Sequence, residues 1–186
     1  MKIPFTSKLD KSFYEKHYID RFFCVCEYTG MMRKAIIRFK SYGKAASFRT
    51  FGLFMTKKLK DKTNVESFDG IVYIPVSNKR LVERGYNQAY LLAKSISKLT
   101  GINVIKNVLK RTLDTKSQKE LNRTARIENI RGVFKVEKPD KIKEKNILLV
   151  DDIMTTGSTL NEASHVLKNA GAKKITAIVL ASGRKY

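Results

Sequence analysis

Residues 147–160, with the sequence ILLVDDIMTTGSTL, constrain the fold of this chain more than any other segment. Their first four residues are all apolar, which predicts a strand buried on both faces of a sheet. The Thr-, Ser- and Gly-rich run after it predicts a loop, and Ser158–Asn169 has the spacing of a helix. A further apolar run, Ile175–Ala181, predicts the next strand. Such a unit is typical of the α/β class, in which helices cover both faces of a parallel sheet.

The rest of the chain shows the same alternation of apolar strands and amphipathic helices, without a Gly/Ser- or Pro-rich linker. We expect helices at residues 31–40, Lys44–Leu59 and Asn87–Leu99, and strands at Ile71–Val76 and within 102–109. In open parallel sheets, ligands bind beyond the carboxyl ends of the strands. The candidate functional residues are therefore those that follow each expected strand.

Two adjacent carboxylates, Asp151 and Asp152, follow the apolar run, and a helix start lies a few residues further on. Backbone N–H groups at a helix start attract a phosphate, and Gly157 lets the backbone approach it closely. A carboxylate can accept hydrogen bonds from both hydroxyls of a vicinal diol. The segment therefore predicts a ribose 5-phosphate site. Further donors are the hydroxyls of Thr155, Thr156, Ser158 and Thr159.

Each half of this motif has an ordinary alternative. Acids at a strand end can bind a metal or cap a helix, and a Thr/Ser/Gly run can be a simple N-cap. Both halves in this order favour a ligand site. The chain lacks a Gly-Lys-Ser/Thr after a glycine-rich run and lacks GxGxxG, which excludes a P-loop and a dinucleotide fingerprint.

Basic residues mark the middle of the chain. Arg80 and Arg84 follow the strand that ends near Ser77, where they can meet a pyrophosphate bidentately or remain solvated. Residues 112–131 are polar and basic, and we expect a mobile loop that passes into a helix. It would close over an anionic ligand, contact nucleic acid, or be an ordinary solvated face. The cations in and beside it are Arg111, Lys116, Lys119, Arg123, Arg126 and Arg131.

The net charge is +21, of which residues 147–186 contribute only +2. A basic surface attracts polyanions such as nucleic acid, although a lysine-rich composition would also produce it. Cys24 and Cys26 are too close for an unstrained disulfide and are expected to be reduced thiols. No run of 18 apolar residues exists, so we expect no membrane span and a cytoplasmic protein.

The segment Val150–Thr159 resembles the ribose-phosphate signature of type I phosphoribosyltransferases. This resemblance implies a central parallel sheet with helices on both faces and a small N-terminal hood. We expect the helical hood region over residues 1–65 and the core over residues 66–186. The implied ligand is 5-phosphoribosyl 1-pyrophosphate with Mg²⁺, which the ligand carries without a direct protein ligand. The implied substrate-binding residues are Val150, Asp151, Asp152, Ile153, Met154, Thr155, Thr156, Gly157, Ser158 and Thr159.

The middle of the chain resembles the ComF family of late-competence proteins, which are associated with uptake of transforming DNA. The shared residues are Pro75, Val76, Arg80, Arg84, Gly85, Tyr86, Asn87, Gln88, Arg111, Thr112, Thr115, Gln118, Leu121, Arg126, Asn129 and Phe134, together with Tyr28, Gly30, Arg33, Ile36, Lys40 and Gly43. Many relatives begin with a four-cysteine zinc module. This chain has only Cys24 and Cys26, and the histidines His17 and His165 have no metal-ligand spacing, so we expect no zinc.

The resemblance implies pentosyl transfer, with Asp151, Asp152 and Arg80 as the catalytic residues. The expected pyrophosphate and basic-loop residues are Ser77, Arg80, Arg84, Arg111, Lys116 and Arg126. The expected partners are single-stranded DNA and a competence helicase, and an oligomer is left open. Two other functions remain: a small-molecule phosphoribosyltransferase of salvage or amidotransferase-like type, and a non-catalytic module that senses a ribose phosphate. Tyr86 either stacks a base or packs a helix start.

Overall fold

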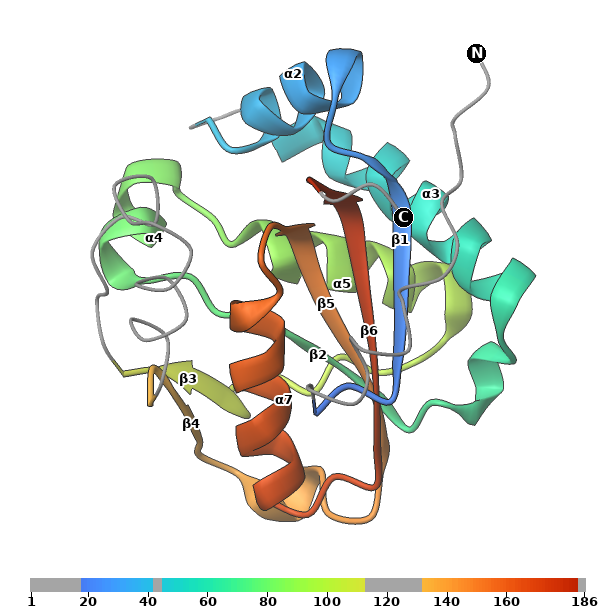
Figure 1. Cartoon of the computed structure of the whole chain (residues 1–186), viewed down its shortest axis with the longest axis vertical. Helices are drawn as coiled ribbons and strands as arrows, with labels where there is room; N and C mark the ends of the chain where they lie inside the picture. Colours follow the sequence, from blue (N-terminus) through green and yellow to red (C-terminus); the bar gives the residue numbers. More distant parts are fainter. Residues whose placement is uncertain (1–17, 42–44, 113–131, 184–186) are drawn as a thin grey trace.

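A parallel four-stranded sheet forms the centre of the molecule (Figure 1). The computed structural model describes residues 18–41, 45–112 and 132–183. The sheet order is β1-β6-β5-β2, with β1 at Arg21–Glu27, β2 at Gly70–Tyr73, β5 at Asn146–Met154 and β6 at Lys174–Ser182. All three pairings are parallel. The predicted α/β class with a central parallel sheet is confirmed.

Helices cover both faces of this sheet (Figure 1). Helix α7, Ser158–Asn169, packs on one face, where Leu160, Ala163 and Leu167 are buried. Helices α3, Phe48–Lys62, and α5, Gln88–Thr100, pack on the other. The apolar run of β5 is fully buried because strands flank it on both sides and helices cover both faces.

Strand β5 is longer than predicted. Asp151 and Asp152 lie within it, not beyond its end, because β6 also continues and pairs Asp151 with Val179 and Met154 with Ser182. The acids therefore stand on a paired strand whose backbone is fixed by the sheet. This is a more rigid support than the loop that the sequence predicted.

The segment before residue 66 contributes to both the hood and the sheet. Helix α2, Gly30–Phe39, lies above the carboxyl ends of the strands, in the position expected for a hood (Figure 1). Strand β1 was not predicted, and it forms the edge of the sheet beside β6. The helix expected from Lys44 begins instead as a 3₁₀ turn, η1, at Ala45–Ser47 and continues as α3. The division at residue 65 stays a prediction.

The connection after β2 contains a helix where a turn was expected. Helix α4 spans Asn78–Arg84, and the Ser77 hydroxyl caps it by accepting a hydrogen bond from the Arg80 N–H at 3.3 Å. Gly85, at φ 76°, ends the helix in the left-handed conformation. β2 itself ends at Tyr73, before Pro75, which has no N–H to donate to a sheet.

The strand expected within residues 102–109 is mostly absent from the structure. Val104 forms an isolated bridge to Ile71. Strand β3, Leu109–Arg111, pairs antiparallel with β4, Phe134–Val136, in a separate two-stranded sheet. The remaining elements are the 3₁₀ turns η2 at Val65–Ser67 and η3 at Pro139–Lys141. None of the helices in the described ranges is long and apolar enough to cross a membrane.

Candidate functional site

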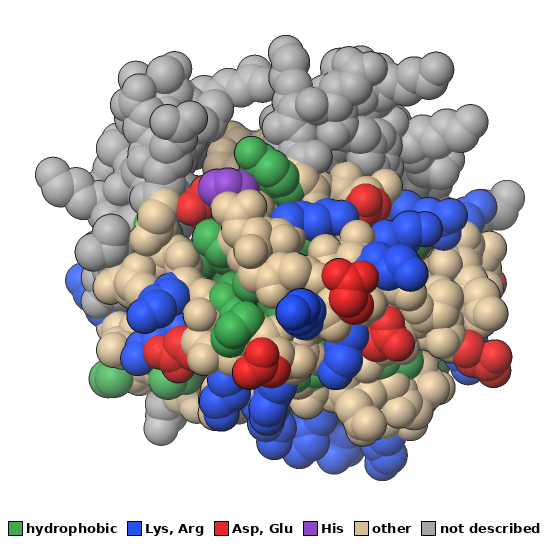
Figure 2. All heavy atoms as spheres, turned by 90° about the horizontal axis from the view of Figure 1, so that it is seen from below, with side chains coloured by type: hydrophobic (Ala, Val, Ile, Leu, Met, Phe, Trp, Pro, Cys, Tyr) green, Lys and Arg blue, Asp and Glu red, His purple; other side chains and the backbone are tan. Residues whose placement is uncertain are grey.

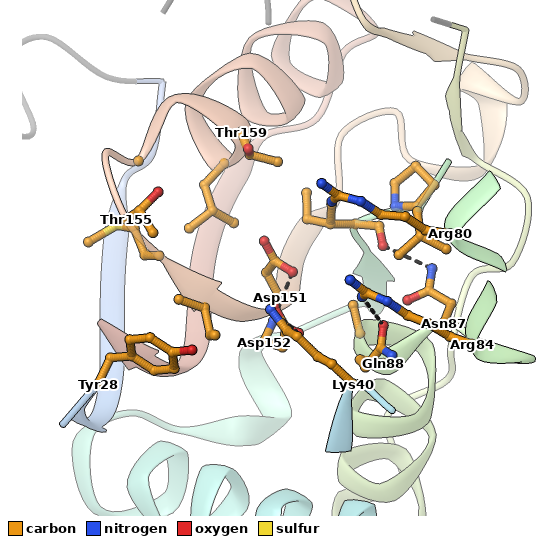
Figure 3. Close-up of a pocket in the computed structure, with 18 of the residues that line it drawn as sticks. Tyr28, Lys40, Arg80, Arg84, Asn87, Gln88, Asp151, Asp152, Thr155 and Thr159 are labelled. Atoms are coloured by element: carbon orange, nitrogen blue, oxygen red, sulfur yellow. Dashed lines mark hydrogen bonds and ion pairs between the residues drawn. The ribbon is translucent and has the colours of Figure 1, made fainter. Parts of the chain in front are cut away.

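A cavity of about 540 Å³ opens at the carboxyl ends of β2 and β5, where the sequence predicted the site (Figure 3). We divide its lining into two walls, which meet where Lys40 pairs with Asp152. The first, which we call the β5–α7 wall, is the continuous segment 151–160. The second, which we call the cationic wall, consists of Arg33, Lys40, Arg80, Arg84 and Arg111. The cavity therefore joins residues that are far apart in sequence.

The β5–α7 wall contains most of the predicted substrate-binding residues. Those that line the cavity are Asp151, Asp152, Ile153, Met154, Thr155, Thr156, Gly157 and Thr159. Two predicted residues do not line it. Val150 is fully buried in the core, and Ser158 directs its hydroxyl to that of Thr156 at 2.9 Å.

The turn between β5 and α7 brings backbone close to the cavity. Gly157 is the N-cap of α7 and has φ 88°, a left-handed conformation that side chains other than glycine adopt with strain. Glycine has no side chain to cap the helix; the Ser158 N–H donates to the Thr156 hydroxyl at 3.4 Å, and the first turn of α7 begins beside the cavity-lining Thr159. This arrangement, with the helix dipole, favours an anion.

The two acids are held differently. Asp151 accepts a hydrogen bond from the Asp152 N–H at 2.8 Å, and the Asp152 carboxylate forms an ion pair with Lys40 at 3.0 Å. Burial, together with the nearby Asp152 carboxylate, raises the pKa of Asp151 to about 8, against the opposing effects of that hydrogen bond, Lys40 and Arg111. Asp151 is therefore mostly protonated near neutral pH when the cavity is empty, and a cationic or hydroxyl-bearing ligand would favour its charged form.

On the cationic wall, three of the four predicted arginines line the cavity, and the fourth, Arg126, lies outside the described residues. Arg80 and Arg84 come from α4, and Arg111 ends β3. Arg84 donates a hydrogen bond to the side-chain oxygen of Gln88 at 2.9 Å. Burial lowers the pKa of Arg84, and the Asp152 carboxylate opposes this effect. Ser77 is absent from the lining and serves as the cap of α4.

Several predicted residues of the basic loop cannot be placed. Lys116 and Arg126 lie outside the described residues, as does all but the first residue of the loop expected over residues 112–131, so its closure stays a prediction. The residues on either side of this loop lie next to each other beside the β3–β4 pair, where the Thr112 N–H donates a hydrogen bond to the Val133 carbonyl at 2.8 Å. Gly132 donates through its N–H to Glu162 of α7 at 2.8 Å.

The hood contributes side chains that the sequence did not assign to the site. Tyr28, Arg33, Ile37 and Lys40 all line the cavity (Figure 3 labels Tyr28 and Lys40). Three of them, Tyr28, Arg33 and Lys40, were among the residues shared with the ComF family, and that sharing was the available signal. The spacing within α2 could not show that this helix lies over the strand ends.

The turn before α5 contributes two more unassigned residues. Asn87 caps α5 by accepting a hydrogen bond from the Tyr90 N–H and donates one to the Ile74 carbonyl at 3.0 Å. Gln88 is buried, and in the described part of the chain its side-chain nitrogen has no hydrogen-bond partner. Both line the cavity. Tyr86 is not among the lining residues, because its hydroxyl points to the backbone of Phe39 and Ser41.

The two cysteines lie on β1, away from the site. Both are buried and neither forms a disulfide, and burial, with a smaller effect of Glu27, raises the pKa of Cys26 to about 11. Within the described ranges, no group of three or more His, Cys, Asp or Glu residues is arranged to hold a metal. The expected absence of zinc stays a prediction.

Known proteins resemble this chain in sequence. Residues 84–186 match the phosphoribosyl transferase domain family. Competence protein F of Haemophilus influenzae is 30% identical over 160 residues, which cover 84% of this chain and 70% of that protein. Competence protein ComFC of Bacillus subtilis is 32% identical over 151 residues, covering 79% of this chain and 58% of the relative. DNA utilization protein YhgH of Escherichia coli K12 is 31% identical over 113 residues. This alignment covers 61% of the chain and only about half, 49%, of YhgH.

Among solved structures, glutamine phosphoribosylpyrophosphate amidotransferase from B. subtilis, complexed with ADP and GMP, has a similar fold. The TM-score is 0.50 at 16% identity, over 73% of this chain and 26% of that one. At this identity the likeness concerns the fold alone. It confirms the predicted phosphoribosyltransferase-like architecture.

Proposed function

Since this chain belongs to the phosphoribosyl transferase family, as a relative of Competence protein F, we propose that its cavity binds 5-phosphoribosyl 1-pyrophosphate. One observation carries the proposal. The N-terminus of α7, the paired acids of β5 and the arginines of α4 face a single cavity, the size of which is in the ordinary range for ligand pockets. These three groups match the three chemical parts of this ligand.

The match proceeds from one end of the ligand to the other. The 5-phosphate would bind against residues 155–159, where the N–H groups of the first turn of α7 and the threonine hydroxyls are donors. The ribose hydroxyls would donate to Asp151 and Asp152. Arg80 would pair with the pyrophosphate, since a guanidinium binds phosphate oxygens through two parallel hydrogen bonds.

The charge balance of the cavity also favours an anion. Among the described lining residues, five are cationic and two are acidic. A ligand with a phosphate and a pyrophosphate would offset this excess. Mg²⁺ would be carried by the ligand, and the two carboxylates of β5 beside it are hard oxygen groups that are compatible with this ion. When bound with the ligand, Mg²⁺ would help to neutralise the departing pyrophosphate.

The reaction that such a site supports is displacement at C1 of the ribose. The C1–O bond to pyrophosphate breaks and the oxygen keeps the electron pair. A nitrogen nucleophile forms the new C1–N bond and releases a proton. Positive charge develops on the ribose ring, and Asp151 and Asp152, beside the hydroxyls, would stabilise it electrostatically. Arg80 would stabilise the leaving group.

Calorimetric titration tests the binding proposal. With Mg²⁺ present, we expect 5-phosphoribosyl 1-pyrophosphate to bind with a dissociation constant between about 1 μM and 1 mM, as is usual for metabolite sites. Ribose 5-phosphate and pyrophosphate should each bind more weakly, because each reaches only part of the cavity. No heat of binding for the full ligand, with a folded protein, would refute the proposal.

Pyrophosphate release then separates an enzyme from a binding module. The assay is run across nitrogen acceptors, including free bases, ammonia and single-stranded DNA. Release that depends on one acceptor identifies a transferase, whether of competence or salvage type. Tight ligand binding without release for any acceptor supports the non-catalytic sensing function.

A second candidate function is direct binding of single-stranded DNA. The net charge of +21 favours it, as do the names of the relatives, which refer to competence and DNA utilization. Basic side chains extend well beyond the cavity. Figure 2 shows Lys and Arg side chains, interspersed with fewer Asp and Glu side chains, on the face seen from below, where β5 and β6 begin. Exposed lysines near these strand starts are Lys138, Lys141, Lys143, Lys173 and Lys174.

Fluorescence anisotropy at increasing salt tests this second function. If ~4 phosphates are neutralised, the logarithm of affinity should fall with the logarithm of salt at a slope of about −3. Replacing the five exposed lysines by Gln should flatten the slope if DNA uses that face. Replacing Lys116, Lys119, Arg123 and Arg126 should do so if it uses the basic loop. Absence of binding at low salt would contradict direct DNA binding. It would not bear on a helicase partner.

A further inference from the structure

Tyr86 makes an unusual contact with the end of the hood helix. Its hydroxyl oxygen lies 2.5 Å from the carbonyl oxygen of Phe39 and 2.9 Å from that of Ser41, so its one proton is shared between two backbone acceptors. These two residues flank Lys40. The ring of Tyr86 also lies 6.1 Å from that of Phe39, which is fully buried. The phenol therefore fixes the backbone on both sides of one residue.

The residue between these acceptors is the one that crosses to the acids. Lys40 caps the C-terminus of α2, and its side chain reaches Asp152 on β5 with a nitrogen–oxygen distance of 3.0 Å (Figure 3). Asp152 is only 8% exposed. A carboxylate with so little exposure needs a paired charge, so Asp152 depends on the Lys40 ammonium. The position of that ammonium depends in turn on where α2 ends.

We propose that Tyr86 is a positioning residue that acts through Lys40. By holding the end of α2, it places the Lys40 ammonium on one oxygen of Asp152 and so orients the other oxygen toward the sugar hydroxyls of the ligand. The proposal rests on the proposed function, because it assigns these residues to the ribose part of the same site. It links the hood to the sheet through the backbone at the end of α2 and the side chains of Lys40 and Asp152.

The neighbouring aromatic contacts support a role in alignment. Phe39 packs edge-on against Phe51 of α3 with ring centroids 5.5 Å apart, so the body of α2 is anchored without Tyr86. The phenol hydroxyl adds a contact at the last residues of the helix only. Removing the hydroxyl should therefore change the position of Lys40 more than the stability of the fold.

A double-mutant cycle tests this proposal with 5-phosphoribosyl 1-pyrophosphate and Mg²⁺ in the calorimeter. Lys40→Met should weaken binding about ten-fold, because it leaves a buried carboxylate unpaired. Tyr86→Phe should weaken it about five-fold, as expected for one lost hydrogen bond. The double variant should bind as Lys40→Met does. Tyr90→Phe is the matched control, because this phenol lies on α5 outside the cavity lining, and it should bind as the wild type does.

Multiplied losses in the double variant would show that Tyr86 acts independently of Lys40, and would overturn the proposal. Thermal melts check that each variant is folded. A second measurement needs no ligand: the carboxyl ¹³C resonance of Asp152, assigned with Asp152→Asn. Tyr86→Phe should shift it in the same direction as Lys40→Met, and an unchanged resonance would overturn the proposal. If the wild type binds no ligand, the proposed function fails, while this measurement still decides the role of Tyr86.

Discussion

The two walls of the cavity are built in different ways. The β5–α7 wall is one continuous segment that runs from a central strand of the sheet into α7, so its residues are neighbours in sequence. The cationic wall collects residues from α2, α4 and β3, and contacts distant in sequence hold it, such as that of Tyr86 with Phe39, 47 residues away. One wall is thus a rigid local motif, and the other depends on how the hood docks.

This difference suggests a division of work between the walls. The rigid wall holds the groups that must contact the sugar and the 5-phosphate. The assembled wall supplies the positive charge for the pyrophosphate, and a shift of α2 or α4 would change it. Loss of the acids of the first wall should therefore weaken binding most, whereas loss of one cation of the second wall should weaken it less.

The largest effect is expected for Asp151→Asn combined with Asp152→Asn. Loss of both charges should weaken binding of 5-phosphoribosyl 1-pyrophosphate with Mg²⁺ at least about 100-fold, because charged acceptors on the ligand hydroxyls and cation are lost. Calorimetry measures the change, and circular dichroism checks the fold. Asp140→Asn, at an exposed position in η3, is the control. Unchanged affinity in the folded double variant would remove the acids from the site.

A smaller effect is expected for Arg80→Gln on the opposite wall. We expect about twenty-fold weaker binding of the same ligand, the loss of one charge-assisted pair. Ribose 5-phosphate, which has no pyrophosphate, should bind both proteins equally. Lys79→Gln removes the same charge from an exposed neighbour outside the cavity lining, and it should change little. Equal losses for the two ligands would place Arg80 elsewhere than at the pyrophosphate.

Gly157→Ala should have a still smaller effect on the β5–α7 wall. A side chain at φ 88° costs about 1 kcal/mol or more, which corresponds to a melting temperature lower by about 2–4 °C. Relaxation of the turn should also weaken ligand binding about five-fold. Gly101→Ala is the matched control, since Gly101 has φ 79° at the end of α5. It should lower the melting temperature similarly and leave affinity unchanged; a loss of affinity there would mean that the effect is one of stability.

The last effect concerns the pH dependence of stability without ligand, not ligand affinity. The pKa of Asp151 rises from 3.8 to about 8 on folding, so the folded protein binds the proton more tightly than the unfolded chain. Its contribution is present below pH 3.8 and is lost as the pH rises to about 8. Asp151→Asn removes this loss. The free energy of unfolding of this variant should exceed that of the wild type by a margin that grows between pH 5 and pH 8 to roughly 2 kcal/mol. This margin is smaller than the full pKa shift would give, because solvent in the cavity screens the repulsion between the two acids.

Thermal melts at pH 5, 6, 7 and 8 measure this change as an increasing difference in melting temperature. Parallel curves for the two proteins would contradict the raised pKa of Asp151. The paired acids would then impose no energetic cost on the folded wild type.

The same comparison explains what could be predicted from the sequence. The strand, the acids and the helix of the β5–α7 wall are consecutive, so local spacing was sufficient to place them at one edge of the sheet. The exact end of the strand was not predictable, because it depends on how far β6 continues beside it. Ser158 was assigned to the ligand by its hydroxyl alone, although that hydroxyl is engaged by Thr156.

The cationic wall was predictable only in part. Arg80 and Arg84 follow a strand, which was a sufficient signal. Ser77 follows it too, but serine is also a favoured N-cap residue, and in the structure Ser77 caps α4. Lys40 required knowledge of where α2 docks, which no local pattern contains. Strand β1 was missed for a related reason, since its mixed sequence RFFCVCE becomes a strand only by pairing with β6.

A crystal structure with 5-phosphoribosyl 1-pyrophosphate and Mg²⁺ would test the central claim most directly. The two-wall account predicts the 5-phosphate at the N-terminus of α7 and the ribose hydroxyls on Asp151 and Asp152. It also predicts the pyrophosphate at Arg80, across the cavity. A ligand bound in the reverse direction, or held outside this cavity, would contradict it.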